Sequence, residues 1–297
     1  MIAETVMKLL LKFNLIFILF FGTGLALAGW GSYRFLQNNA RDEVVHRAEL
    51  MMQSSLAVRT YTTQQIKPLL EKQQAHLLTF LPQTVPAYGA TTVFDFLRKD
   101  QPEYTYKEAT LNPTNLRDRA TDWEADVINV FRNNGHEKEL IGERDTPTGR
   151  SLYLGRPIHA PAPCLECHST PERAPKAMIA SYGRDNGFGW KENEIVGAQI
   201  VSVPMSVPFA IADRAFRSLM IYLAAIFVAT MLCVDTALIF IVIRPVGRLA
   251  GMADRISKGE TGLPELPVRG RDEISGLTAS FNRMYVSLSK ALKLLEE

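Results

Sequence analysis

Residues 164–168 read Cys164-Leu165-Glu166-Cys167-His168, and the organisation of the whole chain can be worked outward from this motif. Two cysteines separated by two residues and followed at once by histidine have the spacing of c-type haem attachment. The two thiols reach the two vinyl groups on one edge of a porphyrin, and His168 is then delivered beneath the iron as its proximal ligand. The motif therefore predicts one covalent haem c, attached through Cys164 and Cys167.

The same residues leave two other kinds of site open. Cys164 and Cys167 could form a structural or redox-active disulfide, although thioredoxin-like pairs open a helix inside a βαβ unit and no such unit is apparent. A zinc site would need two further ligands, which His168 and His159 could supply. Of the three kinds of site, the spacing favours haem attachment.

The motif does not fix the second axial ligand of the iron. Histidine or methionine would suit a low-spin haem. Met51 and Met52 lie about one helical turn beyond His46 in the same predicted helix, so these three residues are the distal candidates. The remaining cysteine, Cys233, lies in an apolar stretch, which excludes an additional thiolate ligand from the rest of the outer segment.

Two stretches of the chain are almost wholly apolar, Phe13–Trp30 and Leu219–Ile243. The second is long enough to cross a bilayer at about 1.5 Å of helix per residue. The first is of marginal length, and Ala26-Leu27-Ala28 would suit cleavage of a signal peptide. The helical pattern continues past Trp30, however, which favours an uncleaved anchor helix.

Basic residues flank both apolar stretches on what must be the same side of the membrane. Lys8 and Lys12 precede the first stretch, and Arg244 and Arg248 follow the second. By the positive-inside rule both ends of the chain belong in the cytoplasm of a bacterium, and the segment between the stretches is periplasmic. The expected divisions are a cytoplasmic N-terminus (1–12), a first transmembrane helix (13–30), a haem domain (31–218), a second transmembrane helix (219–243) and a cytoplasmic segment (244–297).

The outer segment mixes helical and strand patterns. A long helical pattern runs from about Tyr33 to Glu71, a short helix is expected near Thr91–Lys99, and an amphipathic helix over Asn115–Asn134. Strands are expected at 104–111, 140–145, 151–158 and 195–203. Strands mixed with helices on one sheet predict an α+β domain.

One carboxylate lies in the middle of the second apolar stretch. An acid such as Asp235 is costly in a bilayer unless it is neutral, paired or turned toward a bundle interior. Two interpretations stay open. Asp235 either makes a polar contact in a dimer interface that sets the helix register, or is a protonated acid tolerated near the lipid.

The segment after the second apolar stretch carries a coiled-coil pattern. From Ile274 to Leu295, apolar residues recur at alternating intervals of three and four. A lone helix cannot bury such a stripe, so the pattern predicts a homodimer.

Several short motifs are spread through the outer segment. They are Ala57–Thr62, Ile66–Leu70, Val85–Tyr88, Glu108–Pro113, Arg156–Ile158, Cys164–Ser169 and Tyr182–Lys191. Together they resemble a bacterial family of PAS-like haem-c sensory domains, long of unknown function, over roughly residues 35–205. The resemblance implies a PAS-like sheet with flanking helices around a covalent haem. It implies attachment at Cys164 and Cys167 and axial ligation by His168, and leaves the distal ligand open.

The last part of the chain, residues 244–297, resembles a HAMP domain. Pro245 follows the apolar stretch, a connector containing glycine and proline spans 259–270, and Asp272-Glu273-Ile274-Ser275-Gly276-Leu277 opens the second helix. The resemblance implies a parallel, dimeric four-helix bundle and a role in passing signals.

These features predict a membrane-bound haem-c sensor of redox state or of a small diatomic gas, without enzymatic activity of its own. Its HAMP domain would signal to a separate cytoplasmic partner, unless residue 297 is an internal point of a longer sensor. The alternative is a membrane-tethered monohaem electron-transfer cytochrome, which would have no use for the HAMP stripe. A formal net charge of +2 without a concentrated basic patch argues against a nucleic-acid partner.

Overall fold

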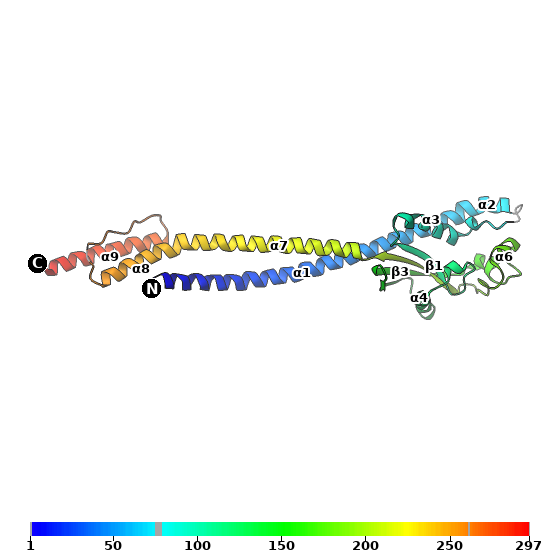
Figure 1. Cartoon of the computed structure of the whole chain (residues 1–297), viewed down its shortest axis with the longest axis horizontal. Helices are drawn as coiled ribbons and strands as arrows, with labels where there is room; N and C mark the ends of the chain where they lie inside the picture. The colour runs from blue at the N-terminus through cyan, green and yellow to red at the C-terminus, as the bar shows by residue number, and fades with distance from the viewer. Residues whose placement is uncertain (1, 75–78, 261, 297) are drawn as a thin grey trace. The chain divides into compact units, whose positions relative to one another are not determined.

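The computed structural model describes residues 2–74, 79–260 and 262–296 (Figure 1). The chain forms two compact units. One consists of Met1–Tyr33 and Ala215–Glu297 and is called the helical unit below, and the other, Arg34–Arg214, is called the sheet unit. Helix α1 (Ile2–Tyr61) contributes residues to both.

A four-stranded antiparallel sheet forms the centre of the sheet unit. Its strands are β1 (Thr105–Thr110), β2 (Leu140–Thr146), β3 (Gly149–His159) and β4 (Ile195–Pro204), in the spatial order β1-β4-β3-β2. All neighbours pair antiparallel. Strand β4 is buried along nearly its whole length, as expected for an inner strand covered on both faces.

One face of the sheet is covered by α1 and by α3 (Pro86–Asp100), as Figure 1 shows. Val44, Ala48 and Met52 are spaced four apart on α1, so they lie on one side of the helix. They pack with Ala90, Phe94, Tyr106, Leu152, Leu154, Val201 and Val203. Burial of each larger apolar side chain stabilises the fold by about 1.5–3 kcal/mol.

The opposite face is covered by α4 (Asp122–Asn133), whose Val127, Ile128 and Phe131 pack against the sheet. The prediction of a helix from Asn115 was wrong at its start. A capping box begins α4 at Asp122, where the Thr121 amide donates to Glu124 Oε2 at 2.8 Å. The residues before it form a separate 3₁₀ turn, Leu116–Asp118.

The predicted α+β class is confirmed by the sheet and the helices on its two faces. Helix α3 begins earlier than expected, because Pro86 occupies its first turn, where a missing N–H costs nothing. The long outer helix passes through a π-helical turn at Thr62–Ile66 and continues as α2 (Lys67–Gln74). A π-turn inside a helix often marks a functional position.

In the helical unit, α1 packs along α7 (Ser206–Ala237), and both helices are long and apolar enough to cross a membrane. The Phe227 ring lies 5.9 Å from that of Phe17 and 6.1 Å from that of Phe21, centroid to centroid. Nearer the other end of the pair, a Cβ on Gly29 would lie 3.3 Å from Met220 Cε. The small residue thus allows a close approach between the helices.

The carboxylate inside the second apolar stretch has a partner in its own chain. Asn14 Nδ2 of α1 donates to Asp235 Oδ2 of α7 at 3.1 Å. Neither sequence-based interpretation of Asp235 included this contact. Pairing lowers the cost of a polar group in apolar surroundings.

Helices α8 (Arg244–Ser257) and α9 (Glu273–Glu296) follow a second π-helical turn at Leu238–Ile243. One face of α9 holds the connector: Asn282 bonds both the N–H and the C=O of Leu266, at 3.1 and 2.8 Å. Tyr285 Oη accepts from the Leu263 amide at 2.7 Å.

A different face of α9 carries the predicted apolar stripe. Leu277, Met284 and Leu288 are 53%, 57% and 42% exposed, so the single chain does not cover them. The side chain of Leu295, the last member of the predicted stripe, lies outside the described residues.

Candidate functional site

The Cys-x-x-Cys-His motif folds into a single helical turn after β3. A 3₁₀ turn, Ala162–Cys164, leads directly into α5, Leu165–His168. Residues three apart on a helical turn are neighbours, so Cys164 and Cys167 present their thiols on the same side. Both are half-buried free cysteines.

The imidazole of His168 is anchored through one of its nitrogens. Nδ1 lies 2.8 Å from the Gly187 carbonyl oxygen and 3.3 Å from Thr114 Oγ1. The Trp190 ring stacks on the imidazole, with centroids 4.0 Å apart and planes inclined by 13°. The hydrogen bond from Nδ1 therefore fixes the rotation of the imidazole in its own plane, and the stacking on Trp190 fixes its tilt.

This anchoring determines which nitrogen can bind a metal. With its proton on Nδ1 donated to the Gly187 carbonyl, the imidazole keeps the lone pair of Nε2 free. Burial lowers the pKa of His168 below its ordinary value, although the hydrogen bond to Gly187 opposes that shift. The ring is consequently neutral at neutral pH, which is the form that ligates metals.

The loop carrying Gly187 is itself tied to the motif. The Trp190 amide donates to the His168 carbonyl at 3.2 Å, and the Gly189 amide donates to the Ser169 carbonyl at 3.0 Å. Asn112 ties the loop to the end of β1, accepting from the Gly187 amide at 3.0 Å. These backbone bonds make the His168 turn and the 187–190 loop one unit.

Gly187 is required by its surroundings. Its φ is +84°, which glycine adopts without strain, and a Cβ there would lie 2.8 Å from Thr114 Cα. In the sequence, residues 182–191 form one of the motifs shared with the haem-c family, and no local pattern indicates their role. In the structure, the 187–190 loop orients the His168 imidazole.

The positive charges of Arg59 and Lys67 act on the cysteine turn. Burial raises the pKa of Cys164, opposed by the charges of Arg59 and Lys67. Burial also raises the pKa of Cys167, where Lys67 opposes it and Glu166 adds to it. The end of α1 and the start of α2 therefore lie close to the cysteine turn.

An ion pair with a buried carboxylate and a half-buried guanidinium lies near this turn. Arg59 of α1 pairs with Glu108 of β1, and Tyr106 Oη donates to Glu108 Oε1 at 2.8 Å. Burial acts to lower the pKa of Arg59, but the Glu108 carboxylate raises it by more. Burial and the same carboxylate raise the pKa of Tyr106 far above its ordinary value, so the phenol remains a donor. Both ionic residues lie in quoted motifs, but nothing local indicated that they would meet.

The three distal candidates occupy different environments. Met52 is fully buried in the core between α1 and the sheet, and Met51 is half-buried against the same core. His46 is exposed to solvent, with its Nδ1 3.9 Å from Glu49 Oε2. The structure thus does not bring them together at one point.

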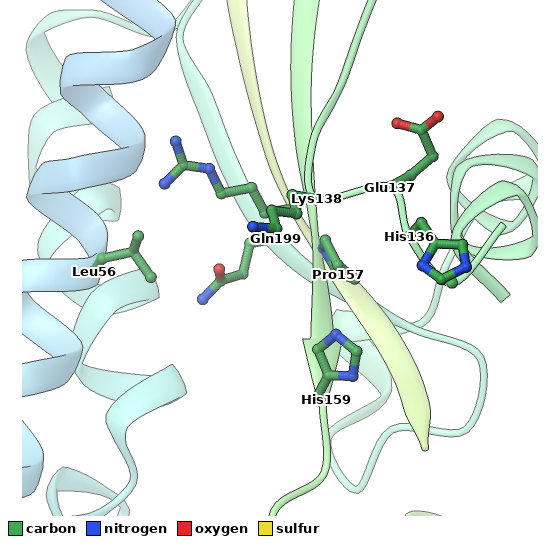
Figure 2. Close-up of a pocket in the computed structure, with 9 residues that line it drawn as sticks. Leu56, His136, Glu137, Lys138, Pro157, His159 and Gln199 are labelled. Carbon is green, nitrogen blue, oxygen red and sulfur yellow. The ribbon is translucent and has the colours of Figure 1, made fainter. Parts of the chain in front are cut away.

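A pocket of about 450 Å³ opens between α1 and the sheet. Figure 2 shows Leu56 on α1 and Gln199 on the sheet, with Pro157 and His159 lower on β3 and His136 on the adjoining loop. The residues that line it do not include Cys164, Cys167 or His168.

The residues of this region fit a covalent haem. Two thiols on one side of a turn suit the two vinyl groups, and the free Nε2 of His168 suits the iron. Beside them, Ser169 Oγ is buried without a hydrogen-bond partner among the described residues, which leaves it free to bond a group held at this turn. The zinc alternative finds no support, because the described residues contain no group of three or more His, Cys, Asp or Glu placed to hold a metal ion.

Comparison with known proteins identifies the family to which the chain belongs. A family model described as Tll0287-like matches residues 37–204, which is more than half of the chain. The chain belongs to the Tll0287-like family. The Tll0287-like region contains the cysteine turn, the 187–190 loop and the whole sheet, and a HAMP domain model matches residues 237–290.

Among solved structures, that of the cyanobacterial haem protein Tll0287 is 17% identical. The match covers 55% of this chain and 93% of that chain, with a TM-score of 0.39. No curated protein matches the chain. The Tll0287-like family is a haem-protein family, and here its domain stands in one chain with a HAMP signalling domain.

Proposed function

We propose that the chain is a membrane-bound haem-c sensor subunit that signals through its HAMP domain. The proposal rests on the presence of two domains in one chain. One is a Tll0287-like domain, whose cysteine turn presents two thiols and an anchored histidine, and the other is a HAMP domain. Cys164 and Cys167 hold the haem, and His168 Nε2 is its proximal ligand. When bound, the haem supplies an iron that changes charge on reduction and can take a diatomic gas.

The protein's own residues prepare the site for this group. Gly187 and Trp190 hold the His168 ring in one orientation and one tautomer, so no reorientation is needed when iron binds. Arg59 and Lys67 place positive charge near the attachment turn.

The proposed topology places the sheet unit in the periplasm and the HAMP domain in the cytoplasm of a bacterial cytoplasmic membrane. The basic residues flanking both apolar stretches support it. Helix α1 runs without interruption through the first stretch to Tyr61, which supports an uncleaved anchor over a signal peptide.

The route of the signal follows from chain connectivity. Central strand β4 ends at Pro204, and α7 begins at Ser206, so the sheet is joined to the second membrane helix with almost no linker. Helix α7 leads through the π-helical turn at Leu238–Ile243 into α8. A shift of β4 caused by the redox state or by a diatomic ligand would therefore act directly on the HAMP helices, which signal to a cytoplasmic partner.

The distal ligand is proposed to come from α1. Met52 lies one turn from Leu56 on the same side of α1, and Leu56 lines the pocket. We expect Met52→Leu to remove the low-spin bands of the visible spectrum while costing less than about 1.5 kcal/mol of stability, because the volume is conserved. Met51→Leu and His46→Gln are the comparison variants. Unchanged spectra in all three would place the ligand elsewhere.

The HAMP domain is proposed to form a parallel homodimer, as HAMP domains usually do. Leu277, Met284 and Leu288 form the interface, and burial of each contributes about 1.5–3 kcal/mol. Met284→Glu should therefore convert dimer to monomer in mild detergent, measured by light scattering. Lys290→Glu, an exposed position on the same helix, is the control and should remain dimeric. A Met284→Glu protein that is still dimeric would contradict this interface.

A further inference from the structure

A row of polar side chains crosses the sheet face that packs against α1. In the register, Arg156 of β3 stands opposite Gln199 of β4, and Gln199 stands opposite Glu108 of β1. The preceding row on the same face, Leu154, Val201 and Tyr106, belongs to the apolar core. The face thus changes from apolar to polar within one row of the sheet.

Two members of this row are buried. Glu108 is 5% exposed and Gln199 is 6% exposed. The Glu108 carboxylate uses both oxygens, one toward Arg59 on α1 and one toward Tyr106 Oη at 2.8 Å. A buried ion pair is weak support for stability, because desolvation can cancel its attraction. Its presence on this face therefore calls for another explanation.

The other buried carboxylate of the sheet unit has an ordinary structural explanation. Glu124 is 6% exposed, caps α4 through the Thr121 amide, and pairs with Lys107 at 2.7 Å. It lies on the opposite face of the sheet, where α4 packs. Glu124 is therefore a matched comparison for Glu108: equally buried and equally paired, but on the other side.

The Arg59–Glu108 pair lies within electrostatic reach of the cysteine turn. Arg59 acts electrostatically on Cys164, one of the two attachment thiols. Gln199, next to Glu108 in the row, lines the pocket together with Leu56, which precedes Arg59 by about one turn of α1 (Figure 2). A group held by the two cysteines in this region would feel both charges.

We propose that the Arg59–Glu108 pair sets the reduction potential of the haem and passes its change of charge to α1. The inference rests on the proposed function. In the redox step, ferric haem accepts one electron from a one-electron donor, its net charge falls by one, and no bond or proton moves. Glu108 favours the ferric state, and Arg59 favours the ferrous state. Because Glu108 is fixed to the sheet and Arg59 to α1, reduction changes the forces on strand and helix in opposite directions.

The test is an equilibrium redox titration of the purified full chain, followed by visible spectra. Glu108→Gln should raise the potential, because a negative charge that stabilises ferric haem is lost. Arg59→Gln should lower it. Each shift should be about tenfold in the ferric-to-ferrous ratio at fixed solution potential, which is about 59 mV for one electron. The control Glu124→Gln should leave the potential near that of the wild type.

The opposite signs of the two shifts distinguish an effect of charge from a loss of structure. A loss of structure around the haem would shift the reduction potential of both variants in the same direction. Should Glu108→Gln fail to accumulate, Tyr106→Phe replaces it. Removing the phenol donor leaves the Glu108 carboxylate less neutralised and should lower the potential. Reduction potentials equal to that of the wild type, or shifts of the same sign in Glu108→Gln and Arg59→Gln, would overturn the inference. A wild-type protein without haem would instead overturn the proposed function.

Discussion

Replacing both Cys164 and Cys167 by alanine is expected to abolish covalent haem completely. The two thiols lie on one side of the same turn, and no other cysteine is present in the sheet unit. Haem staining of the denatured protein on a gel, and resistance of the haem to extraction with acid acetone, measure the attachment. Cys233→Ala should retain full staining.

Single substitutions refine this result. Cys167→Ser should reduce attachment but leave a route through one thioether. Staining of the double variant equal to the wild type would contradict attachment at this turn. Bound zinc in the wild type, with no haem, would contradict the proposed cofactor altogether.

Gly187→Ala is expected to change the orientation of the His168 imidazole. Two costs add: alanine at φ +84° costs about 1–2 kcal/mol, and a Cβ 2.8 Å from Thr114 Cα forces a shift worth about 1–3 kcal/mol. The shift displaces the carbonyl that orients Nδ1. We expect a lower melting temperature together with altered axial ligation in the visible spectrum.

Gly183→Ala is the matched control. Gly183 has nearly the same φ, +82°, but a Cβ there would meet nothing within 4 Å. With ψ at −171°, it lies in a backbone region that essentially only glycine adopts, so Gly183→Ala should show this conformational cost alone, about 1–3 kcal/mol, and leave the haem spectrum unchanged. Equal effects of the two substitutions would show that the 187–190 loop does not position His168.

Local patterns in the sequence were sufficient for much of the fold. Strand β4 was predicted within one residue at its end because β-branched residues concentrate there. The expected start of α4 at Asn115 is wrong because Thr121 and Glu124 form a capping box that begins the helix at Asp122. That signal was local and could have been read.

The contacts that shape the site could not be read in the same way. His168 meets Gly187, Arg59 meets Glu108 and Asn14 meets Asp235, and these pairs are 19, 49 and 221 residues apart. Periodicity reports which side of an element is apolar, but not which distant polar group will face it. The cysteine motif gave the chemistry, whereas its orientation depends on a loop that only the fold brings near.

The same limit applies to the distal side. Sequence alone placed His46, Met51 and Met52 on one helix, which is what α1 shows. Which of them faces inward depends on how α1 packs against the sheet. That packing buries Met52 and leaves His46 in solvent, which is why Met52 is the variant expected to alter the spectrum.

The central claim is that the state of the haem site reaches the HAMP helices, and cross-linking at Leu288 tests it most directly. Leu288→Cys is introduced with Cys233→Ser, and a bismaleimide traps dimers in native membranes under ferric, ferrous and ferrous carbon monoxide conditions. We expect cross-linking rates that differ between states by at least about fivefold, which corresponds to a coupling free energy at the lower end of the usual range of about 1–3 kcal/mol. The difference should vanish when Cys164 and Cys167 are alanine. Dimers that form at one rate in all three states would contradict the sensor and favour a tethered electron carrier.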